Sequence, residues 1–291
     1  MSTCTSINGL SMMNEIKKSM YLPLYIMAVI LICLVCMTSV GYTTPEGKSY
    51  SILSFLMSGW TMEGDIPIGL NRWSVWDAGI YGGWFFFLTP VLGTLGFSYV
   101  YASERDYKVR TFIFTRETIR RYALKKTVAL AVTSGITLLS GYVLFCLITG
   151  WYFPGLSYFS QDEAKSYMQM SMQAGCGRFI LEHVLGMFLF GVTMGGGAGC
   201  IMVLFRDRYF SYSMPVLLNY IYSNVLQKIE IETTDDQVYY MTDLLKPSGL
   251  LQLQGITVRD LLVRLTMIVA VYIVFYVLQV SCIKHQEDMS E

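Results

Sequence analysis

The chain has 291 residues, of which 54% are hydrophobic and 14% are charged, and its 21 basic and 21 acidic residues give a net charge of zero. This composition leaves too little polar surface to cover a soluble globular protein of this length, so the ordinary soluble classes are excluded. The seven cysteines are scattered and only Cys176 is expected outside the cell, so an external disulfide framework is excluded as well.

Six long runs along the chain carry no charged residue. A helix needs about 20 mostly apolar residues to cross the hydrocarbon core of a bilayer, and each run is close to that length. We therefore predict an all-α polytopic membrane protein, with six transmembrane helices in a single domain over residues 1–291. The predicted spans are residues 21–41, 80–102, 127–153, 184–205, 209–226 and 265–283.

The segment before the first span predicts a short amphipathic helix. Over residues 7–20, apolar side chains recur at helical spacing, while Glu15, Lys17 and Lys18 fall largely on the other side. Such a helix lies in the membrane interface, and a frayed tail is the alternative. The first span itself is longer than the core of a signal peptide and lacks a small-residue cleavage site, so we interpret it as a retained helix.

The distribution of basic residues predicts the orientation. If both termini are cytoplasmic, 13 of the 21 Lys and Arg residues lie inside, eight of them between Arg105 and Lys126. Because basic residues concentrate on the cytoplasmic side of membrane proteins, this favours an N-in, C-in topology. That topology requires an even number of spans, and six satisfies it.

The first outer loop, residues 42–77, holds Trp60, Trp73 and Trp76, which are typical anchors at a membrane interface. Its apolar stretch YSILSFLMSGW is too short to span and predicts an interfacial or re-entrant helix. The segment GYTTPEGKS at residues 41–49 resembles a phosphate-binding loop, but it has five residues between its glycines instead of four and no preceding strand. No nucleotide site is therefore expected there.

Small residues recur every four positions in the fourth predicted span, at Gly191, Gly195 and Gly199. They form a flat strip on which another helix can pack closely, either within the chain or in a dimer. Pro215 and Asn219 in the fifth span predict a kinked helix that faces protein or a polar cavity. The polar segment 227–260 before the last span is either a lid over a transport path or a connecting structure.

Catalytic and metal-binding patterns are missing from the sequence. His183 and His285 are the only histidines and neither belongs to a His/Cys cluster, so no metal site is expected. Uncharged span interiors also disfavour a carrier driven by protons or sodium. The sequence therefore gives no reason to expect an enzyme, a cofactor of its own or a nucleic acid as partner.

The inner loop, residues 103–126, is the densest block of positive charge. Its basic residues are interleaved with apolar ones such as Phe112, Phe114 and Ile119. A helix there would be amphipathic. It would either rest on anionic lipid or fit a groove on a cytoplasmic partner.

This arrangement resembles the permease subunit of an ABC-2 type (type V) ABC transporter. Glu104 matches the acidic residue that opens the family's loop, Thr115 and Thr118 match its polar positions, Arg120 or Arg121 its arginine, and Lys125 or Lys126 the lysine that opens the third span. The family's glycine and proline are missing, and Arg116 stands where the proline would fall.

The resemblance implies a multi-pass permease in the cell membrane of a bacterium, in contact with the lipid bilayer. It would work with a separate cytoplasmic ABC ATPase, which binds ATP and Mg, and with a second permease subunit that is identical or related. Its cargo would be amphipathic or hydrophobic, for example a peptide, and would move outward. The loop residues expected to form a coupling helix in the ATPase groove are Phe112, Ile113, Phe114, Thr115, Arg116, Thr118, Ile119, Arg120, Arg121 and Tyr122.

Two other functions are compatible with the same pattern. A membrane scaffold or sensor would use the basic loop to recruit a partner without transport, and an ATP-independent carrier would need no ATPase.

Overall fold

The computed structural model describes residues 12–43, 48–58, 70–106, 109–160, 162, 165, 176–205, 208–232, 250–251 and 258–288. The described residues are mostly helical, as predicted, with one small antiparallel hairpin of β1 (Val40–Thr43) and β2 (Ser49–Ser51). A short helix, Met12–Ser19, precedes α2. The helices are α2 (Leu22–Met37), α3 (Ile52–Ser58), α4 (Arg72–Ile80), α5 (Gly83–Asp106), α6 (Val109–Phe114), α7 (Ile119–Tyr152), the 3-10 helix η2 (Leu156–Tyr158), α9 (Cys176–Leu204), α10 (Arg208–Glu232) and α12 (Val258–Asp288).

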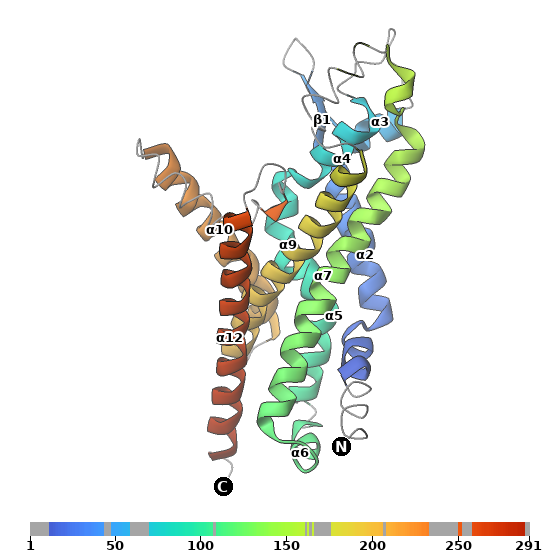
Figure 1. The fold of residues 1–291 in the computed structure, drawn as a ribbon. Coiled ribbons are helices and arrows are strands. Elements are labelled where there is room, and N and C mark those ends of the chain that lie inside the picture. Colours follow the sequence, from blue (N-terminus) through green and yellow to red (C-terminus); the bar gives the residue numbers. More distant parts are fainter. Residues whose placement is uncertain are drawn as a thin grey trace.

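The long helices run between two ends of the molecule (Figure 1). The hairpin, α3 and α4 gather at one end, which we call the hairpin end. The helix Met12–Ser19, α6 and the last turns of α12 gather at the other, which we call the α6 end. Segments near both termini therefore lie at the same end as the basic loop, which is the arrangement that an even number of spans requires.

Four helices are long and apolar enough to cross a membrane, over Trp84–Arg105, Ile119–Tyr158, Gly177–Leu204 and Val258–His285. Met12–Ser19 and α2 would make a fifth if the pair counts as one span, although they meet at an angle of 60°. α10 has 25 residues but is not among them, because its tyrosines, asparagines and charged ends lower its hydropathy. These helices are typical of a membrane protein, while the count of six and the orientation stay predictions.

Several helices extend beyond the apolar runs that predict them. α7 begins at Ile119 and α12 at Val258, each within a stretch that carries charged residues. Lys, Arg and Glu are good helix formers, so a change in polarity does not by itself end a helix. Of the predicted interfacial helix, residues 7–11 lie outside the described residues.

α7 is the central helix of the bundle and packs against α2, α5, α9 and α12. The glycine strip of α9 makes one of these contacts possible. A methyl group on Gly191 would lie 2.8 Å from the backbone oxygen of Ser134 and 2.9 Å from the Cα of Gly135, and one on Gly195 would overlap Ser134. A methyl group on Gly199 would collide with Leu130. The strip therefore faces α7 inside this chain.

Aromatic side chains fill the bundle toward the hairpin end. Phe85 stacks on Phe190 with 5.8 Å between ring centroids, and both are buried. Trp73 and Trp76, which stay predicted interfacial anchors, pack on each other, and the Trp76 Nε1 donates a hydrogen bond to Thr149 on α7. Trp60 lies outside the described residues, and Trp151 is 93% exposed, which is what an interfacial anchor requires.

His183 links α9 to α4 at the same end. It is buried, with its Nδ1 2.9 Å from the backbone oxygen of Phe179 and its Nε2 3.3 Å from the carboxylate of Asp77. The neighbouring Glu182 instead pairs with Arg178 one turn earlier at 2.6 Å. The sequence predicts both Glu182 and His183 as solvated residues at the outer end of the fourth span, but the Glu182 side chain is only 15% exposed and His183 is buried.

Candidate functional site

The basic loop at the α6 end is a compact turn between α6 and α7. The backbone amides of Arg116 and Glu117 both donate to the backbone oxygen of Ile113, at 3.0 and 2.9 Å. The Thr115 hydroxyl donates to the backbone oxygen of Phe112 at 2.7 Å, and Glu117 forms an ion pair with Lys125. These contacts fix the backbone that presents the side chains of α6.

The side chains expected to dock on a partner differ in how accessible they are. Phe112 is 75% exposed, although exposing a large aromatic ring to water is unfavourable. Ile113, Phe114 and Ile119 are partly buried. The remaining polar members, Thr115, Arg116, Thr118, Arg120 and Arg121, are exposed. Among the described residues of the loop, the accessible surface therefore includes the Phe112 ring, the Leu124 side chain and three exposed arginines, Arg116, Arg120 and Arg121.

Tyr122 has a different position, because it is 3% exposed and lies beneath the loop. Its ring packs edge to face on Phe114, with 5.4 Å between centroids. Its hydroxyl donates a hydrogen bond to Glu104 at 2.8 Å. Phe114 and Tyr122 thus connect the loop to the membrane helices, and Tyr122 is not available to an approaching partner.

Beneath Tyr122 lies a cluster of four charged residues from three helices, which we call the inner ion-pair cluster: Glu15, Lys18, Glu104 and Lys126. The Lys126 Nζ lies 2.8 Å from Glu104 and 2.6 Å from Glu15. The Lys18 Nζ lies 2.6 Å from the same oxygen of Glu104. Two ammonium groups and two carboxylates balance in charge.

Burial determines how strongly this cluster resists disruption. The Glu104 and Lys126 side chains are only 3% and 1% exposed. Removing one partner of a buried ion pair leaves an uncompensated charge, which costs about 3–5 kcal/mol. Lys18 is 48% exposed and contributes less. The contact between Glu104 and Lys126 therefore fixes the end of α5 to the start of α7. Glu15 also pairs with Lys126 and so attaches the helix Met12–Ser19 to the same point.

The sequence identifies the two central residues of this cluster but not their neighbours. The resemblance matched Glu104 and either Lys125 or Lys126 to the two ends of the loop, and the structure brings Glu104 and Lys126 into contact while Lys125 pairs with Glu117. Nothing in the sequence pairs Glu15 with Lys126, 111 positions later. The only signal was that Glu15 and Lys18 share one face of a helix.

The other predicted features lie elsewhere in the molecule. The glycine strip of Gly191, Gly195 and Gly199 is within the bundle and does not reach the loop. Most of the predicted outer segment 227–260 lies outside the described residues. Among the residues that the structure describes, no group of three or more His, Cys, Asp and Glu side chains could hold a metal ion.

Comparison with known proteins adds no assignment, because no family model matches the sequence and no curated protein matches it.

Proposed function

We propose that the chain is the membrane-spanning permease subunit of an ATP-driven ABC exporter in the plasma membrane. A separate cytoplasmic ATPase would bind ATP and Mg, and a second permease, identical or related, would complete the transport unit. The cargo would be amphipathic or hydrophobic, for example a peptide, and would move outward. In this proposal, the α6 end faces the cytoplasm and receives the ATPase.

The observation that supports this proposal best is Phe112. A ring that is 75% exposed on an ordered, basic loop is well suited to insertion in a groove on another protein, because burial of such a ring contributes strongly to binding. The exposed arginines beside it would affect encounter and salt dependence more than affinity.

A transport role also requires that the docked loop move the membrane helices. Phe114 contacts Tyr122, Tyr122 contacts Glu104 on α5, and Glu104 contacts Lys126 on α7. Displacement of the loop by an ATPase would therefore reach both helices through contacts that are costly to break. This continuous path favours a coupling function over passive attachment to lipid.

Substitution of Phe112 tests the proposal. Phe112→Asp should leave folding intact, because the ring contributes little to the fold, and should reduce capture of an ABC ATPase by the purified chain at least tenfold, since a charge would be buried at the contact. The capture is measured by affinity purification from the native membrane, with the ATPase quantified by mass spectrometry. Met57→Asp is the matched control, because Met57 is 81% exposed at the opposite end.

Two results would contradict the proposal. One is the absence of any ABC ATPase in the wild-type capture. The other is an unchanged capture with Phe112→Asp together with loss of binding to anionic vesicles when Arg120 and Arg121 are neutralised, which would assign the loop to the lipid surface.

A further inference from the structure

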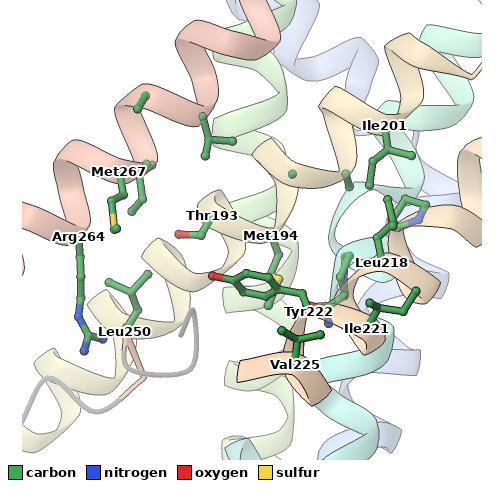
Figure 2. Close-up of a pocket in the computed structure, with 18 residues that line it drawn as sticks. Thr193, Met194, Ile201, Leu218, Ile221, Tyr222, Val225, Leu250, Arg264 and Met267 are labelled. Carbon is green, nitrogen blue, oxygen red and sulfur yellow. The ribbon is translucent and has the colours of Figure 1, made fainter. Parts of the chain in front are cut away.

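A cavity of about 800 Å³ lies between α5, α9, α10 and α12 (Figure 2). It exists because α10 and α12 each pack on α9 rather than on each other, and in Figure 1 α10 leans away from α12 toward its C-terminal end. Its volume lies within the range of about 300–1,000 Å³ that is typical of sites for small ligands.

The wall of the cavity is largely apolar. Met194, Ile201, Leu218, Ile221, Val225 and Met267 are among the side chains that surround it. Two of its polar residues donate hydrogen bonds to backbone oxygens of the chain: the Thr193 hydroxyl to Leu189 at 2.9 Å, and the Asn219 amide to Phe86 at 2.6 Å. Most of the wall therefore suits an apolar ligand.

Arg264 is the only charged side chain among the described residues that line the cavity. It is 6% exposed, and in Figure 2 it lies beside Leu250 at the edge of the ring of lining residues. A guanidinium group has five N–H donors in a planar fork, so it can contact a ligand and a group of the protein at the same time. The fork matches a carboxylate or phosphate head group.

We propose that this cavity binds a single-chain amphiphile with an anionic head group, such as a fatty acid. The head group contacts Arg264, and the apolar chain extends along the side chains of α9, α10 and α12. The volume accommodates one such chain. The cavity is open rather than enclosed, so the ligand can enter it from the bilayer. The site is independent of the proposed ATPase, so its test needs no ATP.

The test uses the full chain in nanodiscs of phosphatidylcholine, with a photoreactive palmitate analogue as the probe. We expect saturable labelling that maps to α9, α10 or α12 and is displaced by palmitate. Arg264→Gln should weaken palmitate binding about tenfold or more, as expected for loss of a hydrogen bond to a charged group. Binding of the uncharged alcohol with the same chain should change little.

Three further variants separate the head-group contact from general damage to the fold. Arg264→Lys keeps the charge and should retain more palmitate affinity than Arg264→Gln. Arg259→Gln is the matched control, because Arg259 is exposed on the same helix and does not line the cavity, so it should bind as the wild type does. Gly197→Leu should weaken binding of both acid and alcohol, because Gly197 lines the cavity, a Cβ atom there meets nothing within 4 Å, and the rest of the leucine would occupy cavity volume.

The proposal is overturned if labelling does not saturate or maps to other helices. It is also overturned if Arg264→Gln weakens the acid and the alcohol equally while Gly197→Leu affects neither. Should Arg264→Gln fail to fold, a wild-type chain that does not prefer palmitate to the alcohol would overturn it as well.

Discussion

The inner ion-pair cluster provides the most quantitative prediction. Glu104→Gln keeps the size of the side chain but removes the charge that two lysines share, at 2.8 Å for Lys126 and 2.6 Å for Lys18. Lys126 is 1% exposed and would keep only Glu15 as an anionic partner in the cluster. The expected loss of stability is about 3–5 kcal/mol, as for other broken buried pairs.

Thermal unfolding in detergent, followed by the fluorescence of the partly buried Trp73 and Trp76, measures this loss. Domains of 150–250 residues lose about 2–4 °C of Tm per kcal/mol, so we expect Tm to fall by about 6–20 °C. Glu182→Gln is the matched control, because it removes the same charge from a pair in which Arg178 is 62% exposed and Glu182 is 15% exposed, so that solvent reaches one partner. Exposed pairs on a helix contribute only about 0.3–0.5 kcal/mol.

A double variant tests the reasoning more strictly. Lys126→Met combined with Glu104→Gln removes the two buried charges together. The double variant should therefore lose less unfolding free energy than the two single variants lose in sum. A wild-type Tm for Glu104→Gln would refute the argument, because it would mean that the carboxylate is not a buried partner of Lys126. Strict additivity of the two changes would refute it equally.

The glycine strip and the topology provide the remaining predictions. Gly191→Ala should destabilise the chain, because the new methyl group would lie 2.8 Å from a backbone oxygen of α7 that cannot move independently. Gly197→Ala on the same helix is the control: its methyl group meets nothing within 4 Å, so it should be neutral or slightly stabilising. Equal detergent stability of the two variants would show that α9 does not pack on α7 through this strip. The orientation is tested in a chain with Cys176 replaced by serine. A membrane-impermeant thiol reagent added to intact cells should label Ser157→Cys and not Thr115→Cys, because these exposed positions lie at the hairpin end and the α6 end. The reverse labelling pattern would invert the predicted orientation.

The apolar runs predict where the long helices lie, because the desolvation of backbone groups in lipid forces such segments to form helices. They do not predict where the helices end. Val258 and Ile119 begin helices within charged stretches, since outside the bilayer the hydrogen-bonding of the helix continues as long as the residues tolerate it. A prediction from hydropathy therefore places the first residue of both α7 and α12 too late in the chain.

The functional features depend on tertiary contacts that no local pattern contains. Lys126 meets Glu15 only because the helix Met12–Ser19 turns by 60° at the start of α2. The cavity arises from the divergence of α10 and α12, and its wall is apolar although Asn219 and the tyrosines of α10 favoured a polar one. The exposure of Phe112 and the burial of Tyr122, both aromatic residues of the same amphipathic loop, depend on which side of the loop meets α5.

The length of α7 determines how far its two ends move when the helix tilts. Its 34 residues form a rod about 51 Å long at 1.5 Å per residue, with Lys126 near one end and Thr149, the acceptor of the Trp76 hydrogen bond, near the other. A rod of that length that tilts by about 5° around its middle moves its two ends by about 2 Å in opposite directions. The glycine contacts with α9 lie close to that midpoint, where the displacement is smallest. If the proposed coupling holds, a tilt of α7 about this tightly packed region would move Lys126 and Thr149 in opposite directions.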